Sequence, residues 1–533
     1  MSKLFNVINL LNNKFDIIKP LIVYLLLSAI LFNFFKYSAL QDLISYLSIS
    51  QKYYNGDFSN AINGVWGPLL SWLMIPLNYI NLNPIISFKF LQILIGALTI
   101  LSITKFLDFF GFQKVLKNYL ILSSILIIEY YVYLTGTPDL LFACIVIYLI
   151  LLFLKWDLNK IKFSIYSGLL GVLLYFAKPF GFPYFIILFV LFNVLFYWLI
   201  NKKVNIVNLR NTFIGLFVFG ILSLPWIYLI SIKYERVTFS TGGEYNFAIV
   251  GPQYESKHIP RIEKLYKPVN NTAASYWEDP TFLIAEKWNP FSSIDNFLHL
   301  TKIVFQNTVQ SIFLFLKFSP LLLLFLFLES PKKVFGEPRI KLIVFVGLVY
   351  MSGIVLLFID QRFLIHLRII LLVITGVYAA SILNKLKLNT LFKTLALIFL
   401  MISLSAQPIY SLIKHLNYGK DIFRIADITQ KSYDIHGNIA SISANPLDED
   451  WGSTLTISYL LNSKYFGEVD SKLDQNAIYT ELKKYKVSYL FVWDLELDFK
   501  HQCFIKIFNN NLFLYDSFLG YKNKKKLTIF KII

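Results

Sequence analysis

Charged side chains stand beside long apolar stretches at four places in this sequence. Asp42 follows the first apolar stretch, and Asp139 follows Pro138 at the start of a later one. Lys178 and Arg362 lie where other apolar stretches end or begin. A carboxylate can take the proton from an attacking hydroxyl or amine, and fixed cations can bind a phosphate and neutralise the charge on it as it leaves. These residue types suit a transfer reaction from an anionic lipid donor.

Each of these residues also has a simpler structural interpretation. An acidic residue such as Asp139 complements the dipole at a helix N-terminus. Lys178 could extend its cationic end to the membrane surface, and Arg362 beside Asp360 could form an exposed ion pair. For Asp42 the sequence shows neither a cap nor a partner nearby. A carboxylate at a membrane edge is costly unless it is solvated, paired or useful, so the sequence favours a functional role for Asp42.

The composition indicates which elements must position these residues. The chain has 533 residues, of which 56% are hydrophobic and 17% aromatic, a composition typical of a protein with many membrane spans. Its net charge of +18 comes largely from basic residues in short loops between apolar stretches. We therefore read the charge as topology information and expect no nucleic-acid partner. The two cysteines provide neither a disulfide framework nor a metal-binding pattern.

Apolar stretches of about 20 residues predict the membrane spans. The eleven candidates are 18–36, 85–104, 115–133, 139–155, 163–177, 182–200, 211–232, 303–328, 340–359, 363–383 and 390–411. A shorter stretch, 69–80, contains Pro76 and is interpreted as a helix in the membrane interface. Because basic short loops stay in the cytoplasm, we expect a multi-pass protein of a bacterial inner membrane. Its N-terminus would be cytoplasmic and its C-terminus extracytoplasmic.

The expected organisation is a transmembrane domain over 1–411 and a small extracytoplasmic α/β domain over 419–533. Within the first domain, 37–84 forms an outer loop with interfacial helices, and 233–302 forms a long outer loop. In the second domain, strand-like runs at 438–443 and 487–493 alternate with helical runs at 453–461 and 481–486, which indicates an α/β fold.

The order and sidedness of several short motifs resemble the GT-C membrane glycosyltransferases, in particular the ArnT/protein-mannosyltransferase-like group that uses polyprenyl-phosphate sugars. The resemblance covers roughly residues 18–410. The matching positions are Asp42 with Tyr46 and Gly56, Gly67-Pro-Leu69, Thr137-Pro-Asp-Leu-Leu141, Gly168–Gly181, Arg362-Phe-Leu364, Thr241-Gly-Gly-Glu-Tyr-Asn246, Gly251-Pro252, His258 and Trp277-Glu-Asp-Pro280.

The resemblance implies a GT-C-like fold and an inverting transfer of a sugar from a polyprenyl-phosphate carrier to an acceptor outside the cytoplasm. The acceptor would be lipid A, a protein or a glycan. Asp42 matches the essential acidic residue of the first outer loop, as base or acceptor-orienting group, and Asp139 matches the second acidic position. Both are expected to be catalytic. The residues expected to bind substrate are Tyr46, Tyr54, Lys178, Arg362 and His258.

One departure from the family pattern concerns the first outer loop. Aminoarabinose transferases tend to show Glu-Lys-Pro where this chain has Trp66-Gly67-Pro68. This difference argues against aminoarabinose and against a lysine-to-phosphate contact in that loop. A divalent metal requirement stays open, as do the roles of His258, Glu278 and Asp279.

Other classes of protein compete with the transferase interpretation. A transporter or flippase for a lipid-linked sugar usually places its charges near the bilayer midplane. Here charges within the spans are scarce, and most candidate residues lie at the ends of spans. The clearest exceptions are Glu129 and Lys89, and Lys89 lies near a span end. An O-antigen ligase or polymerase, or a non-catalytic envelope assembly protein, would give Asp42 no clear task. The sequence favours the glycosyltransferase.

Overall fold

The computed structural model describes residues 2–80, 82–157, 160–201, 206–254, 264–283, 287–386, 388–444, 450–497, 503–515 and 522–533. For 2–17, 200–201, 511–515 and 522–524 it describes the backbone alone. The chain divides into two compact units. The helical unit comprises 1–32, 90–228 and 293–412, and the mixed unit comprises 33–89, 229–292 and 413–533.

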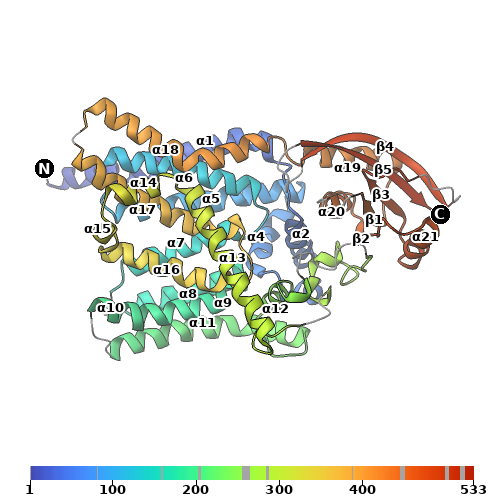
Figure 1. Ribbon diagram of the computed structural model, residues 1–533, viewed down its shortest axis with the longest axis horizontal. Coiled ribbons are helices and arrows are strands. Elements are labelled where there is room, and N and C mark those ends of the chain that lie inside the picture. Colours follow the sequence, from blue (N-terminus) through green and yellow to red (C-terminus); the bar gives the residue numbers. More distant parts are fainter. Residues whose placement is uncertain are drawn as a thin grey trace. The chain divides into compact units, whose positions relative to one another are not determined.

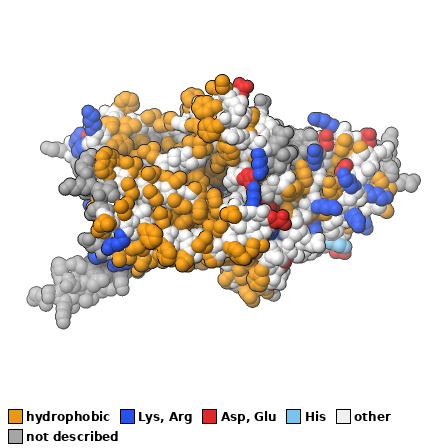
Figure 2. Space-filling view, turned by 90° about the horizontal axis from the view of Figure 1, so that it is seen from below, with side chains coloured by type: hydrophobic (Ala, Val, Ile, Leu, Met, Phe, Trp, Pro, Cys, Tyr) orange, Lys and Arg blue, Asp and Glu red, His pale blue; other side chains and the backbone are white. Residues whose placement is uncertain are grey.

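Long apolar helices build the helical unit, and they run alongside one another in Figure 1. Their sequences are apolar all round, so their outward faces also carry hydrophobic side chains, among them Leu94, Phe213 and Phe327. Figure 2 shows such side chains covering a broad face of this unit. A helix that is apolar on every side is typical of a membrane span. The protein is therefore a multi-pass membrane protein.

The helices of this unit, including four that cross its boundary (α1, α5, α11 and α18), are α1 (Ser2–Phe35), α5 (Pro84–Asp108), α6 (Lys114–Leu134), α7 (Asp139–Leu154), α8 (Lys162–Ala177), α9 (Gly181–Leu191), the π-helical turn η1 (Phe192–Phe196), α10 (Tyr197–Asn201), α11 (Ile206–Lys233), α13 (Ile294–Phe318), α14 (Leu321–Leu328), α15 (Pro331–Phe335), α16 (Pro338–Ile354), η5 (Gln361–Leu364), α17 (Ile365–Lys385) and α18 (Thr390–Lys414).

Each predicted span overlaps one helix or a run of two or three consecutive helices, although the lengths differ from the prediction. Seven helices in the described part of the chain are long and apolar enough to cross a membrane, or eight if one bent pair counts as a span. Helices α7 and α8 have 16 residues each and α16 has 17. At about 1.5 Å per residue, these helices are shorter than a hydrocarbon core of about 30 Å.

The predicted span over 303–328 is not a single continuous helix. Helices α13 and α14 meet there at an angle of 87°, with Ser319 and Pro320 between them. Proline disfavours the helical conformation of the residue before it, and Ser319 accordingly has φ −143° and ψ 74°. The predicted helix at 69–80 is present as α4 (Pro68–Asn78) and contains Pro76 as expected.

The mixed unit contains the predicted α/β domain. Its five-stranded sheet has the order β2-β1-β3-β5-β4, in which β1, β2 and β3 are parallel and β4 and β5 are antiparallel to their neighbours. The elements are α19 (Lys420–Tyr433), β1 (Asn438–Ser443), α20 (Asp450–Leu460), β2 (Lys464–Glu468), α21 (Gln475–Lys484), β3 (Tyr489–Trp493), β4 (Phe504–Tyr515) and β5 (Lys522–Ile532). The sequence analysis identified β1, β3 and parts of α20 and α21, but not α19, β2, β4 or β5.

Strand β3 shows how this domain builds a core on both faces of its sheet. Side chains alternate between faces along a strand. Tyr489, Phe491 and Trp493 join a hydrophobic cluster with α19 and α20. Leu490 and Val492 join a second cluster with α21. The near-continuous apolar run of β3 follows from burial on both sides.

The rest of the mixed unit consists of two segments from between the spans. The first contains α2 (Gln41–Tyr54), α3 (Phe58–Ala61) and α4, and the second contains α12 (Gly242–Ala248), η2 (Pro252–Tyr254), η3 (Tyr276–Glu278) and η4 (Pro280–Leu283). The second segment lies against the edge strand β2, where the Tyr266 N–H donates to the Phe466 carbonyl at 2.7 Å. Isolated bridges join Leu265 to Gly467 and Ser275 to Tyr465. These contacts cover an edge that would otherwise expose unpaired backbone groups.

Candidate active-site residues

Asp42 occupies the first turn of α2. The positive end of the helix dipole favours a carboxylate there. The indole N–H of Trp277 donates to Asp42 Oδ1 at 3.1 Å. The sequence analysis saw no partner for Asp42 because Trp277 lies 235 positions further along the chain. Tertiary structure therefore supplies a group that orients the carboxylate.

Trp277 connects Asp42 to the α/β domain. Its ring lies 5.4 Å from that of Trp451, measured between centroids, and Trp451 belongs to the first turn of α20. Next to Trp451, Gly452 faces Gln41, and a Cβ at this glycine would collide with the Gln41 side chain. Three segments of the mixed unit thus meet beside Asp42. They are the N-terminus of α2, the turn η3 and the start of α20.

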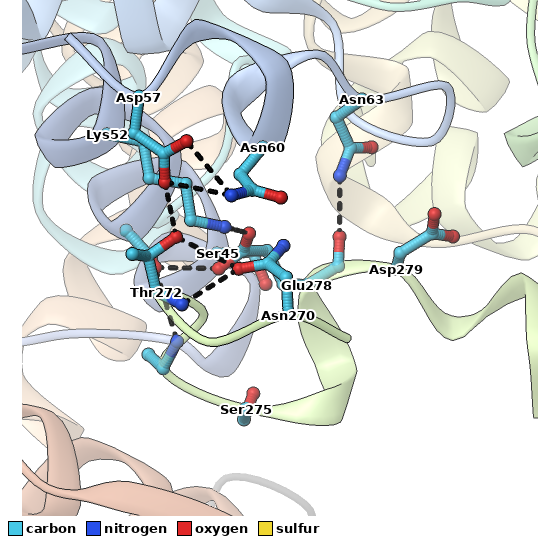
Figure 3. Close-up of polar contacts among 12 residues, drawn as sticks. Ser45, Lys52, Asp57, Asn60, Asn63, Asn270, Thr272, Ser275, Glu278 and Asp279 are labelled. Atoms are coloured by element: carbon cyan, nitrogen blue, oxygen red, sulfur yellow. Dashed lines mark hydrogen bonds and ion pairs between the residues drawn. The ribbon is translucent and has the colours of Figure 1, made fainter. Parts of the chain in front are cut away.

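A buried ion pair fastens η3 to α2 (Figure 3). Lys52 Nζ pairs with Glu278 Oε1, and both side chains are only 2% exposed. The Ser48 hydroxyl donates to Glu278 Oε2 at 2.6 Å. Burial raises the pKa of the Glu278 carboxyl, while Lys52 and Ser48 favour its charged form and act in the opposite direction. The role of Glu278, which the sequence left open, includes holding the two segments together.

The stretch after α3 reinforces this attachment. Asn63 donates through Nδ2 to the Glu278 carbonyl at 2.7 Å, and the Trp66 indole donates to the same oxygen at 2.9 Å. Trp66 also lies edge-on against Tyr46, with 5.3 Å between ring centroids. Trp66 is one of the two residues, with Gly67, that depart from the expected family pattern. In this chain it anchors the second segment instead of offering a charge.

The neighbouring carboxylate, Asp279, accepts a hydrogen bond from the Tyr234 hydroxyl at 2.6 Å. Burial and the adjacent Asp279 charge raise the pKa of Tyr234. Asp57, the other acidic residue of the first segment, accepts from Thr272 at 2.6 Å and from Asn60 at 2.9 Å. The Thr272 hydroxyl lowers the pKa of Asp57. Asp57 thus accepts a hydrogen bond across the two segments (Figure 3), whereas Asp279 accepts one within the second segment.

The two predicted tyrosines are placed differently from each other. Tyr46 is 3% exposed and lies within this cluster, with its carbonyl accepting from Ser71 at 2.9 Å. Tyr54 is 40% exposed at the far end of α2 and contacts Tyr79, with 4.7 Å between ring centroids. His258 lies outside the described residues. Within the described residues, no group of three or more His, Cys, Asp or Glu side chains could hold a metal.

The remaining predicted residues form a second cluster, in the helical unit. Lys178 follows the last residue of α8 and pairs with Asp139 at 2.5 Å. Asp139 is the first residue of α7 and also accepts a hydrogen bond from Thr137. Asp139 is only 3% exposed in its side chain, whereas Lys178 is 24% exposed. In this geometry the buried Asp139 carboxylate positions the more exposed ammonium group of Lys178.

Lys178 and Arg362 converge on one aromatic ring. Lys178 Nζ lies 4.3 Å from the centroid of Phe363, and the Arg362 guanidinium carbon lies 5.3 Å from it. Asp360 is the N-cap of the turn η5, and its carboxylate accepts from Arg362 Nε at 3.1 Å. Two partly exposed cations on one ring, each with a carboxylate behind it, can bind an anion such as a phosphate.

Two buried residues of α17 were not identified from the sequence. His366 is 1% exposed, and neither of its ring nitrogens has a hydrogen-bond partner; its ring lies 4.2 Å from Tyr350, between centroids. Arg368 is also 1% exposed. Both residues are ionisable and lie inside an apolar stretch, which is a signal of function in a membrane protein. The sequence analysis considered this signal only for Lys89 and Glu129.

The sequence matches no protein-family model and no curated protein. The structure is similar to two crystal structures of ArnT from Cupriavidus metallidurans. The apo structure aligns with a TM-score of 0.53 at 12% identity, over 95% of this chain and 97% of that one. The structure bound to undecaprenyl phosphate aligns with a TM-score of 0.51, at the same identity and coverage. The expectation of fold is confirmed: this chain has the GT-C fold of ArnT.

Proposed function

We propose that the protein is a membrane glycosyltransferase that moves a sugar from a polyprenyl-phosphate carrier to an acceptor, with inversion. The observation that carries the proposal is the ArnT fold over nearly the whole chain, in combination with Asp42. One of the similar ArnT structures binds undecaprenyl phosphate, which supports a carrier of this class. The acceptor is lipid A, a protein or a glycan.

The proposed chemistry assigns Asp42 to the acceptor. Its carboxylate takes the proton from the acceptor hydroxyl or amine as that group attacks the anomeric carbon. The bond to the carrier phosphate breaks on the opposite face of the sugar, so the configuration inverts. The phosphate leaves as a stable anion, and no strong general acid is required. Trp277 fixes one oxygen of Asp42 during this step.

The proposed chemistry assigns Lys178 and Arg362 to the carrier phosphate. Their partly exposed charges neutralise the negative charge that increases on the phosphate as the bond breaks. Asp139, the second expected catalytic carboxylate, takes part in this proposal by holding Lys178 in place. Tyr46, Tyr54 and His258 retain proposed substrate-binding roles. Among the tyrosines, Tyr54 is the more exposed and thus the more accessible.

The proposed location is the inner membrane of a bacterium, with transfer on its outer face. The basic residues of alternate short loops support this topology. It places the N-terminus in the cytoplasm and both 37–84 and 233–302 outside. Residues 1–411 then form the catalytic membrane domain, and 419–533 form an extracytoplasmic domain.

The decisive experiment compares cells that carry only Asp42→Asn, at wild-type protein level, with cells that carry the wild-type protein. Mass spectrometry of lipids and glycans is expected to show loss of one sugar adduct, and a deletion strain identifies which adduct that is. Asp57→Asn is the matched control, because it removes a carboxylate from the same segment without touching Trp277. An unchanged glycan profile in the Asp42→Asn cells would contradict the catalytic assignment.

A further inference from the structure

Arg368 is a buried cation for which the proposed reaction has no use. It is the fourth residue of α17 and is 1% exposed. Its guanidinium donates through Nη1 to Gln407 Oε1 at 2.6 Å and through Nη2 to the Leu404 carbonyl at 3.3 Å. The Phe318 ring lies 4.6 Å from the guanidinium carbon. All three of these partners are uncharged, and none of the described carboxylates pairs with Arg368.

The charge balance around the start of α17 is incomplete for this reason. Lys178 is paired with Asp139, and Arg362 with Asp360, whereas Arg368 contributes a positive charge without a counter-ion. The N-terminal end of α17 adds roughly half a positive charge. Burying an unpaired ion costs several kcal/mol even after relaxation, and the ring and the two neutral acceptors offset only part of that cost. An anion would restore the balance.

The hydrogen-bonding groups around Arg368 are also unbalanced, because donors are in excess. Arg368 Nε–H is buried and has no partner. The Tyr131 hydroxyl feels the guanidinium charge but makes no hydrogen bond of normal geometry. Tyr130 accepts from Gln361 Nε2 at 2.9 Å, so its own hydroxyl proton can still be donated. Several donors around a fork-shaped cation match an anion with several acceptor oxygens, as phosphate has.

Helix α18 supplies two of the Arg368 partners, Gln407 and Leu404, and its other side is exposed. Only 33% of the apolar stretch of this helix is buried. Ile402, Tyr410 and Ile413 on its outer side are each more than half exposed. Gln407 lies on the inner side of this helix, directly before Pro408, which removes one backbone hydrogen bond from the helix. A phosphate oxygen that takes the place of Gln407 Oε1 at Nη1 would keep that donor satisfied.

We propose that Arg368, together with Tyr131, binds the phosphate of a membrane lipid between α6, α17 and α18. The site is distinct from the Lys178 and Arg362 cluster and takes its own phosphate group. The ligand is either the phosphate of a polyprenyl carrier or that of a bulk phospholipid, since the two share the chemistry that Arg368 recognises. Binding at this site requires no sugar transfer, so it can be measured whether or not the proposed reaction occurs.

The experiment counts bound lipids by native mass spectrometry on full-length protein stripped of lipid in a neutral detergent. Undecaprenyl phosphate, phosphatidylglycerol and uncharged undecaprenol are added in separate series. We expect wild-type protein to retain a phosphate lipid that Arg368→Gln binds at least about tenfold more weakly, which is the usual effect of losing a charge-assisted hydrogen bond. Arg339→Gln, at a half-exposed arginine of α16, should bind as wild type does, and undecaprenol should not bind at the Arg368 site.

Tyr131→Phe keeps the test decisive if Arg368→Gln fails to fold. This change removes a hydroxyl that makes no hydrogen bond in the structure, so a purely structural cluster predicts no loss of stability or binding. The proposal predicts several-fold weaker retention of the phosphate lipid. Preference for undecaprenyl phosphate over phosphatidylglycerol assigns the site to the carrier, and the reverse assigns it to bulk lipid. Wild-type retention of both lipids by Tyr131→Phe and by folded Arg368→Gln overturns the proposal.

Discussion

Removing the charge of Glu278 should destabilise the mixed unit strongly, because it leaves Lys52 buried without a partner. Both side chains are 2% exposed, so water cannot replace the lost ion pair. Breaking a buried pair from one side typically costs about 3–5 kcal/mol. Glu278→Gln preserves the shape of the side chain and its capacity to accept from Ser48. The expected loss therefore reports on the charge and not on a cavity.

The partner variant should behave differently. Lys52→Met leaves a carboxylate instead of an ammonium, and burial already raises the pKa of Glu278. Without Lys52 that pKa rises further, and the carboxyl escapes the cost of an unpaired charge by taking up a proton. A folded-state pKa above the unfolded value means that stability falls as the pH rises through the interval between them. The Lys52→Met defect should consequently shrink toward low pH.

The assay is thermal unfolding of the detergent-solubilised protein, followed by tryptophan fluorescence, since Trp66 and Trp277 adjoin the pair. For a unit of this size, 1 kcal/mol corresponds to a Tm change of about 2–4 °C. Glu278→Gln should therefore lower the Tm by about 6–20 °C. The double variant Lys52→Met/Glu278→Gln removes both charges and should recover most of the loss.

Two results would refute this reasoning. One is a Tm of Glu278→Gln within about 2 °C of wild type, which is below the smallest shift expected from the cost of an unpaired buried ion. The other is a double variant as unstable as the worse single variant, which would mean that the two charges do not interact. Glu235→Gln is a suitable control, because it changes an exposed glutamate in the same unit.

Three further predictions test other parts of the structure. Trp277→Phe removes the donor to Asp42, so transferase kcat should fall about tenfold with a smaller change in KM; an unaltered kcat would argue against positioning by the indole. Lys178→Met leaves the buried Asp139 without its cation and should lower the free energy of unfolding by about 3 kcal/mol, measured by thermal unfolding. Lys178→Arg keeps a cation there and should retain most of the wild-type stability. Basic partners lower the pKa of Glu244, so its stabilisation is present above the ordinary carboxyl pKa and is lost as the pH falls through the lowered value. Glu244→Gln should therefore be less stable than wild type by about 0.5 kcal/mol at pH 7, and denaturant unfolding should show this difference shrinking as the pH falls below the ordinary carboxyl pKa.

The membrane class and the positions of the helices followed from composition, because a span must be apolar along its whole length. Helix lengths did not follow as reliably. The signal for the bend in 303–328 was present in Ser319-Pro320, but a hydropathy window averages over it. Strand β1 was predicted because its short run of apolar and small polar residues is bounded by turn-forming residues. Strands β4 and β5 were not identified, because they are rich in lysine and asparagine and gain their stability from pairing with each other.

Asp42 and Asp139 illustrate what the sequence could determine about the candidate site and what it could not. Residue type and position beside an apolar stretch identified both carboxylates, since the cost of a charge at a membrane edge is a local property. Their partners were decided by tertiary structure alone. Trp277 reaches Asp42 across 235 positions, and Lys178 reaches Asp139 across 39. A hydrogen bond depends on distance in space, which one-dimensional spacing does not record, so only the folded chain distinguishes an oriented carboxylate from one that holds a cation.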